Sequence, residues 1–302
     1  MKKAIKGITI AICCVFAVLI VLFAVFECDL ARYLNDKEAY DVSTKPIADE
    51  ITVMSFNIRY RAFEDVHKKS WLYRASLVKQ TVADVKPDII GFQEVTPTHE
   101  KYLKSHLDGY GFFVAYRSKV LKEGMLIAYR KDRFTLQDEG YFWLSTTPEK
   151  QSKDWNTSSY RIAAYTKLYD TQTGKSFTVL DTHLDNSSDE ARAKGMEVII
   201  QQVAARGLGS MILMGDMNDY ENSPMFVTAT TNGLKDARNS SPQVYDGSGS
   251  TWHNYGKQLN NKRIDYFFIT NSINVLDYFV YDKTFDGTYP SDHFPIVTKL
   301  AF

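Results

Sequence analysis

Hydrophobic and polar positions divide the chain into three parts. Residues 7–26, GITIAICCVFAVLIVLFAVF, form one uncharged apolar run that is long enough to cross a bilayer as a helix. Residues 29–50 are polar and predict a tether between this run and the rest of the chain. From Ile51 onward apolar and polar segments alternate. We therefore expect an N-terminal membrane anchor or signal segment over 1–28 and one folded domain over 51–302.

The alternation after residue 50 predicts a mixed α/β domain. Helices are expected at 70–86, where Pro87 stops the pattern, and at 188–206. A loop rich in Ser, Gly, Asn and Pro is expected at 239–250. Strands are expected at 51–60, 88–94, 110–116, 124–130, 160–169, 176–183, 210–216, 264–270, 275–281 and 295–301. So many strands with few helices favour two mixed sheets packed face to face, with helices outside.

Charges around the apolar run predict its orientation. Three lysines precede the run and Glu27 and Asp29 follow it, so we expect a cytoplasmic N-terminus and a domain outside the cell membrane. The alternative is a signal peptide that is cleaved to release a secreted domain. The run is long for a signal peptide, no A-x-A-like site follows it, and Glu27 before Cys28 is a poor fit to a lipoprotein site. An uncleaved single-pass anchor is therefore favoured.

Charge and cysteine content limit the kinds of site that the domain can contain. The chain has 36 basic and 36 acidic residues, and three of the basic ones precede the apolar run. The remainder has 33 basic residues against 36 acidic ones, so a polyanion must be bound through a local site or a cation. All three cysteines, Cys13, Cys14 and Cys28, lie in or beside the apolar run, which excludes a disulfide or a thiolate metal site in the domain.

Polar side chains interrupt the apolar strands near their ends several times. A buried polar group without a partner costs about 1–3 kcal/mol, so such positions need a reason. Each one alone has an ordinary explanation as a turn residue, a solvated carboxylate or a structural histidine. Together they supply what phosphodiester cleavage needs. The residues are Asn57, Glu94, His183, Asp216, Asn218, Asp265, Asp292 and His293.

These residue types suit metal-assisted phosphoryl chemistry. Glu94 and Asn57 offer hard oxygen ligands, which favour Mg²⁺ or Mn²⁺ over zinc. Such an ion polarises the phosphoryl group and stabilises the leaving oxygen. His293, oriented by a neighbouring carboxylate, can accept a proton from water or donate one to a phosphate oxygen. Asn218 and His183 can donate to the equatorial oxygens, where negative charge develops.

Six short motifs follow one another along the chain: MSFNIR, QE, THLD, GDMND, RIDYFF and SDHFP. With them the sequence resembles the endonuclease/exonuclease/phosphatase superfamily of DNase I-like phosphoesterases over about residues 51–302. The resemblance implies a four-layer α/β/β/α sandwich, and the apolar run predicts one N-terminal transmembrane helix before it. It also implies that Glu94 is the principal metal ligand, with Asn57 and Asp292 beside the metal.

The resemblance also implies roles for the remaining residues. His183 would contact the scissile phosphate, and Asp216 and Asn218 would position the attacking water. Asp265 and His293 would form an Asp–His couple. Whether one or two metals act, and whether the aspartate or the histidine is the base, stays open.

Four further residues are weaker candidates for substrate binding. Arg161 is equally well explained by a structural ion pair, and Tyr116 by packing in a chain with 19 tyrosines. Thr251 and Trp252 precede the Asp265 segment and are candidates to line the cleft. The tryptophan suits stacking on a base or a lipid head group, but it also suits simple packing.

The leading interpretation is a membrane-anchored, extracytoplasmic, Mg²⁺-dependent phosphodiesterase that is nuclease-like. A sphingomyelinase-like lipid hydrolase is the second, because an anchor holds the site near a bilayer, although no apolar docking stretch stands out after residue 26. An inositol-phosphate phosphatase is disfavoured by MGDMNDYEN, which lacks that branch's aromatic pair and arginine. A non-catalytic binding module is a third alternative. Glu94 and His293 argue against it, because non-catalytic relatives typically lose one of these two residues. The partners expected are therefore a phosphodiester substrate and a membrane; no protein partner is inferred.

Overall fold

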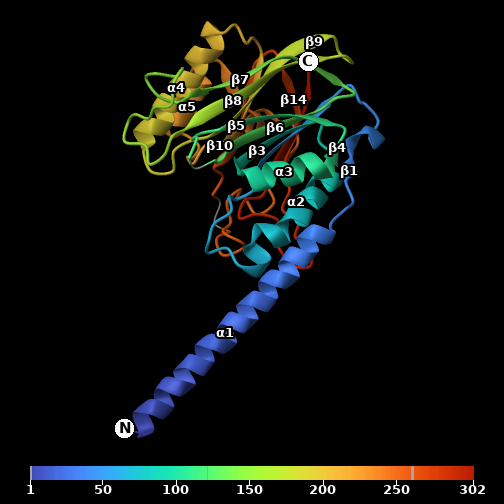
Figure 1. Ribbon diagram of the computed structural model, residues 1–302. Helices are drawn as coiled ribbons and strands as arrows, with labels where there is room; N and C mark the ends of the chain where they lie inside the picture. The colour runs from blue at the N-terminus through green and yellow to red at the C-terminus, as the bar shows by residue number, and fades with distance from the viewer. Residues whose placement is uncertain (1, 121, 260–261) are drawn as a thin grey trace.

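The computed structural model describes residues 2–120, 122–259 and 262–302, without the side chains of residues 2–11. Two mixed sheets form the centre of the domain (Figure 1). The first has seven strands in the order β12 (Val244–Tyr245), β14 (Asn274–Val280), β15 (Ile296–Ala301), β2 (Ile51–Asn57), β3 (Ile89–Val95), β6 (Gly124–Arg130) and β5 (Tyr110–Tyr116). The second has six, in the order β11 (Leu234–Asp236), β13 (Asp265–Thr270), β10 (Met211–Asp216), β9 (Lys175–His183), β8 (Ile162–Asp170) and β7 (Phe134–Trp143).

Three apolar clusters define four layers. The middle cluster joins the two sheets and contains Val53 and Ile127 of the first and Val179 and Met214 of the second. The second cluster packs α4 (Asp189–Ala205) and α5 (Pro224–Thr231) on the six-stranded sheet. The third packs α2 (Trp71–Val85) and α3 (Pro97–His106) on the seven-stranded sheet. The four-layer α/β/β/α sandwich expected from the sequence is confirmed.

The layers explain the apolar runs of the central strands. Every residue of β2 and of β10 is buried, because each strand has the other sheet on one face and helices on the other. The helices begin at serine caps: the side chain of Ser70 accepts from the backbone N–H of Tyr73 in α2, and that of Ser188 accepts from Ala191 in α4. Short elements complete the domain: β1 (Tyr40–Asp41), β4 (Leu107–Asp108), α6 (Ala237–Ser240) and the 3₁₀ turns η1 (Val42–Thr44) and η2 (His67–Lys69).

Some elements differ from the expectations. Strand β7 was missed because it lies at a sheet edge, where most of its side chains are at least partly exposed and the apolar pattern is weak. Helix α3 was missed because only three of its residues are buried. The loop expected at 239–250 contains the two-residue strand β12, which pairs in parallel with β14.

Residues 29–50 are not the expected tether. Helix α1 (Lys2–Asn35) continues through the apolar run and ends on the domain, beside α2 (Figure 1). Asp29 is buried against His67 and Ser70, and Asp36 binds Lys79 and Tyr102. The polar residues of this segment therefore serve a docking contact. The part Ile12–Asn35 is long and apolar enough to span a membrane, a property that it shares with signal sequences.

Candidate active site

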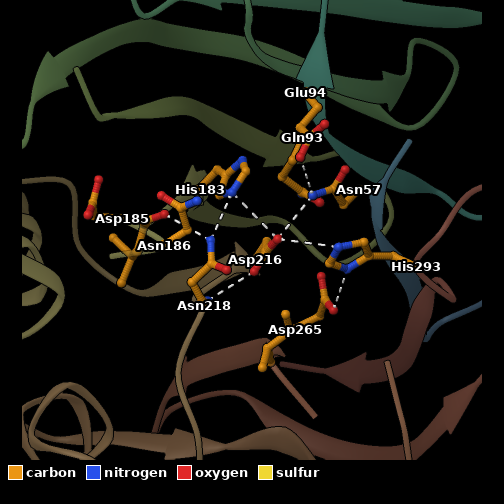
Figure 2. Close-up of polar contacts among 12 residues, drawn as sticks. Asn57, Gln93, Glu94, His183, Asp185, Asn186, Asp216, Asn218, Asp265 and His293 are labelled. Atoms are coloured by element: carbon orange, nitrogen blue, oxygen red, sulfur yellow. Dashed lines mark hydrogen bonds and ion pairs between the residues drawn. The ribbon is translucent and has the colours of Figure 1, made fainter. Parts of the chain in front are cut away.

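The cleft lies where the ends of strands from both sheets meet. Asn57 ends β2 and pairs in register with Gln93 of β3, and Glu94 follows next in the chain. In the other sheet Asp216 pairs with His183 of β9 on one side and with Asp265 of β13 on the other. This register brings side chains that are far apart in the sequence into one cleft of about 630 Å³. Figure 2 shows them converging on Asp216.

Asp216 is the centre of the polar contacts. Its Oδ2 accepts a hydrogen bond from Asn57 Nδ2 at 3.0 Å and lies 3.6 Å from His293 Nε2. Its Oδ1 accepts from the backbone N–H of Asn218 at 2.9 Å. Gly215 precedes it at φ +144°, where a Cβ would lie 1.9 Å from the carbonyl oxygen of Thr182. Only glycine allows β9 and β10 to approach so closely and to hold Asp216 in the cleft.

His293 lies between two carboxylates. Its Nδ1 is 3.0 Å from Asp265 Oδ2, and its Nε2 faces Asp216. Burial alone would lower the pKa of His293, but Asp265 and Asp216 outweigh burial and raise it to about 10. Burial and the charge of Asp265 raise the pKa of Asp216 to about 7. The chain Asp265–His293–Asp216 therefore holds a proton on the histidine at neutral pH.

His183 and Asn218 form the other side of the cleft. Asn218 Nδ2 lies 3.0 Å from His183 Nε2 and donates to the carbonyl oxygen of Leu184 at 3.1 Å. Burial and the charges of Arg161 and Arg117 lower the pKa of His183 well below its usual value. His183 is therefore neutral, and Asn218 holds its Nε2 as a hydrogen-bond acceptor in this arrangement.

Asn57 and Glu94 lie on the other side of Asp216, away from His183 (Figure 2). Glu94 Oε1 accepts from Asn57 Nδ2 at 3.2 Å, and its Oε2 accepts from the backbone N–H of Tyr60 at 2.6 Å. Glu94 has φ +62°, at the point where the pairing of β3 with β6 shifts register. A left-handed conformation costs of order 1–3 kcal/mol at a non-glycine residue, and it is typical of functional positions.

The donor set fits a hard divalent cation. Asp292, which is 6% exposed, lines the same cleft as Glu94 and is a candidate second carboxylate ligand. The guanidinium of Arg59 lies 3.7 Å from Asp292 Oδ2. Burial lowers the pKa of Arg59, but its hydrogen bond to Asp65 and the charge of Asp292 outweigh burial and raise it. Ligand atoms of Asp216, Asp265 and His293 also lie within 4.8 Å of one another and could hold an ion. That trio is already joined internally through the protonated histidine, so Glu94, Asn57 and Asp292 are the better candidates.

Cationic side chains line the outer part of the cleft. Arg161, which is 6% exposed, lies 3.5 Å from Asp185 Oδ2 through its Nε, and its Nη2 donates to Asn186 Oδ1 at 3.5 Å. Trp252 also lines the cleft, with Lys262 Nζ 4.8 Å above its ring. Both Arg161 and Trp252 therefore line the cleft, and Arg161 also makes the structural ion pair that was its alternative explanation.

The other two weaker candidates lie elsewhere. The hydroxyl of Tyr116 donates to Glu100 on α3 and is outside the cleft. Thr251 Oγ1 accepts from the backbone N–H groups of Ile264 and Asp265 at 3.0 and 3.1 Å. Thr251 thus fixes the start of β13 and acts on Asp265 through the backbone, and it does not face a substrate.

Several cleft residues were missed by reasoning from the sequence. Asp185 ends the motif THLD, which was the available signal, and it anchors Arg161 and Ser158. Arg117 and Arg192 line the cleft from a loop and from α4, and no local pattern marks them. Behind the cleft, Gln93 Nε2 donates to Asp181 Oδ1 at 2.6 Å, and burial raises the pKa of Asp181 well above its usual value.

Fold and cleft together are typical of the class of phosphoester hydrolases that carry acid–base and metal-binding side chains at strand ends. The sequence matches the Endonuclease/Exonuclease/phosphatase family over residues 54–293, and the chain belongs to this family. Members of the family hydrolyse phosphoester bonds and generally depend on a divalent metal.

Solved structures share the fold over the whole domain. A family protein of Bacteroides vulgatus is 29% identical, with a TM-score of 0.79, over 84% of this chain and 100% of that one. The mannosyl-6-phosphatase Bt3783 of Bacteroides thetaiotaomicron is 28% identical, with a TM-score of 0.77, over 83% and 100%. The exoribonuclease subunit Ccr4 of Debaryomyces hansenii is 22% identical over 67% of this chain and 30% of that one. The chain spans 30–38% of the length of the curated relatives that it matches.

Proposed function

We propose that this chain is a divalent metal-dependent phosphoester hydrolase, anchored by α1 with its catalytic domain outside the cell membrane. One observation carries the proposal. Asn57 donates to both Glu94 and Asp216, so the candidate metal ligand Glu94 adjoins the chain Asp265–His293–Asp216, and Asp292 lines the same cleft. A cation site and a proton-transfer chain next to each other are what phosphoester hydrolysis requires.

Each side chain has a task that follows from its environment. A cation bound by Glu94, Asn57 and Asp292 supplies Lewis acidity at a phosphoryl oxygen. Protonated His293, fixed by Asp265, donates from Nε2 to a phosphate oxygen as charge develops there.

Asp216, opposite His293, is the group that we expect to bind the attacking water. Asp216, oriented by the backbone of Asn218, accepts a hydrogen bond from the attacking water. Neutral His183 and the amide of Asn218 complete the polar surface around the phosphoryl group. Arg161 neutralises negative charge on the substrate.

The cleft favours small, polar phosphoesters. Its volume of about 630 Å³ lies in the range of small-molecule sites. Among the described residues five basic and five acidic side chains line it, and the chain beyond the apolar run has 33 basic residues against 36 acidic ones, so the cleft has no excess of positive charge for a long polyanion. Similarity to a mannosyl-6-phosphatase over the full length of that protein supports a sugar phosphate or another small phosphoester as substrate.

Nuclease-like phosphodiester hydrolysis is the second candidate. Trp252, with Lys262 above its ring, offers a surface on which a base could stack at the edge of the cleft. The similarity to an exoribonuclease subunit points in the same direction. A sphingomyelinase-like activity is the remaining alternative, and it would use the same cleft at the surface of a bilayer.

Hydrolysis by the purified full-length chain in detergent tests the proposal. We expect 4-nitrophenyl phosphate or bis(4-nitrophenyl) phosphate to be cleaved with Mg²⁺ or Mn²⁺, and the activity to disappear with a chelator or in Glu94→Ala. Glu139→Ala, at an exposed position of β7, is the matched control and should keep full activity. Absence of hydrolysis of both compounds with either metal would refute the function.

A substrate panel ranks the candidates. Mannose 6-phosphate, single-stranded RNA and DNA, and sphingomyelin are compared at equal phosphate concentration. We expect release of inorganic phosphate from the sugar phosphate to have the highest kcat/KM. Shortened oligonucleotides would favour the nuclease, and release of phosphocholine would favour the lipid hydrolase.

The location is tested separately. Intact mass of the chain purified from membranes shows whether the N-terminal segment is retained, and protease added to whole cells shows on which side the domain lies. We expect the full mass and an accessible domain. A mass that lacks the apolar run would refute the anchor and leave the hydrolase untouched.

A further inference from the structure

A second cavity lies beside the anchor. It has a volume of about 510 Å³ and lies between the outer end of α1 and the segment 61–72, which connects β2 to the start of α2. Leu22 and Phe26 line it from α1, and Phe63 and Val66 line it from the connection. Phe63 is 101% exposed and Val66 59% exposed, so the described residues leave Phe63 uncovered and Val66 only partly covered.

The position of this cavity along α1 determines whether lipid or water would cover it. The run 7–26 has 20 residues, and a helix of that length spans about 30 Å, the thickness of the hydrocarbon core of a bilayer. Phe26 is therefore at the outer edge of the core, and Leu22 is about 6 Å deeper. Because Phe63 and Val66 line the same cavity as Leu22 and Phe26, they lie at the level of the outer leaflet.

The side chains that flank Phe63 and Val66 are of the types found at a bilayer surface. In the sequence Arg61 precedes Phe63, and Lys68 and Lys69 follow Val66, and such basic side chains suit lipid phosphates. The acids between them, Glu64 and Asp65, pair with Arg59. Tyr60, which is 37% exposed, precedes them, and aromatic side chains with a polar tip are enriched at the bilayer surface. Apolar tips between basic flanks are typical of segments that insert into the interface.

Contacts between α1 and the domain fix this arrangement. Asp29 lies 3.3 Å from His67 Nδ1 and accepts from Ser70 Oγ at 3.3 Å, and Arg32 donates to Ser76 Oγ of α2 at 3.1 Å. The guanidinium of Arg32 also lies 4.5 Å from the centre of the Tyr73 ring. The connection is therefore held against the helix at one height.

We propose that the segment 61–66 is a second membrane contact, which places Phe63 and Val66 among the lipids of the outer leaflet beside α1. The proposal rests on the anchor of the proposed function. Acyl chains of that leaflet fill the cavity between Phe63 and the outer end of α1. Arg59 and Tyr60, a few residues earlier in the same connection, line the active-site cleft. The contact thus holds one wall of the cleft at the lipid surface.

Site-specific fluorescence of the full chain in phospholipid vesicles tests the contact. A background in which Cys13, Cys14 and Cys28 are replaced by alanine receives one new cysteine, Phe63→Cys, which is labelled with an environment-sensitive fluorophore. We expect emission at shorter wavelength than in the aqueous control described below, and quenching when lipids brominated near the head of the acyl chain are included.

Two controls separate the possible failures. Leu19→Cys, which is 54% exposed in the middle of the apolar run, should be quenched by lipids brominated deep in the acyl chain. Val227→Cys, which is 46% exposed on α5 in the opposite outer layer, should show aqueous emission and no quenching (Figure 1). All three variants leave the catalytic residues intact, and their hydrolysis rates should equal that of the background.

The outcomes are distinct. Quenching at positions 19 and 63 but not at 227 supports the contact. Quenching at 19 with aqueous emission at 63 overturns the contact and leaves the anchor in place. Short-wavelength emission at 63 without lipid quenching means that another protein surface covers it, which also overturns the proposal. Loss of quenching at 19 refutes the anchor and the contact together, while the hydrolysis assay reports on the catalytic function by itself.

Discussion

The residues between β2 and α2 connect the polar cleft to the apolar cavity. The two sites differ in how far their side chains are fixed by other residues of the protein. In the cleft each reactive side chain is already fixed by others, as Asp216 is by Asn57, Asn218 and His293. In the cavity Phe63 and Val66 are exposed beside α1. The side chains of the cleft are held in place before a substrate binds. The surface proposed to contact lipid gains its contacts only from the membrane.

The largest effect is expected in the cleft. His293→Ala removes the proton donor and the partner of Asp216 and Asp265, so kcat should fall by ~10²–10⁴-fold. Steady-state hydrolysis of 4-nitrophenyl phosphate measures it, and circular dichroism verifies the fold. A variant with near-normal kcat would show that the Asp265–His293–Asp216 chain is structural.

Two substitutions at the cavity compare a buried side chain with an exposed one. Trp71 is 1% exposed and Phe63 is fully exposed, although both line the cavity. Trp71→Ala should lower the free energy of unfolding by ~3–5 kcal/mol, and Phe63→Ala should change it by less than ~0.5 kcal/mol. Chemical denaturation of the full chain in detergent measures both. Equal losses would mean that Phe63 is packed within the protein.

A smaller effect is expected from the residue that positions His293. Asp265→Asn keeps the shape of the side chain but removes the charge that orients the ring, so kcat should fall by about 10²-fold with little change in KM. Asp138→Asn, at an exposed position of β7, is the matched control and should leave both parameters unchanged. A rise in KM alone would indicate that Asp265 serves binding.

The smallest effect concerns a buried acid behind the cleft. Asp181 Oδ2 has no hydrogen-bond partner among the residues that the structure describes, and burial raises the pKa of its carboxyl. The folded state therefore keeps the proton to higher pH than the unfolded state, and stability falls as pH rises above about 4.

Asp181→Asn removes this loss, so it should stabilise the chain by ~1–3 kcal/mol at pH 7 and by less near pH 4. Thermal unfolding at the two pH values measures the difference. A variant that is less stable at pH 7 would show that the ionised carboxyl is tolerated through its bond to Gln93.

The fold was predictable where burial leaves a pattern. Central strands such as β2 and β10 are buried throughout and mostly apolar, and their polar last residues, Asn57 and Asp216, identified the cleft. Edge strand β7 and helix α3 have too few buried positions to show a period. The pattern of one segment does not reveal what packs on it, so the docking of residues 29–50 on the domain could not be read from the sequence.

The candidate site was predictable to the extent that its residues end strands. Arg117 and Arg192 lie on a loop and on α4, and they reach the cleft only through the packing of the layers. Phe63 and Val66 are separated in the sequence by Glu64 and Asp65, so no apolar stretch is visible there. Their shared surface exists only once the connection lies against α1.

The docking of α1 on the domain also determines how the catalytic domain searches its surroundings. A flexible chain of about 20 residues has an average span of ~25 Å and would let the domain sweep a hemisphere above its anchor. Contacts of Asp29 and Asp36 with the domain remove that freedom. With α1 in a bilayer, as proposed, the cleft then moves only as the whole molecule diffuses in the plane of the membrane. A soluble phosphoester would have to reach this one height by its own diffusion, whereas a lipid substrate would be met by lateral diffusion.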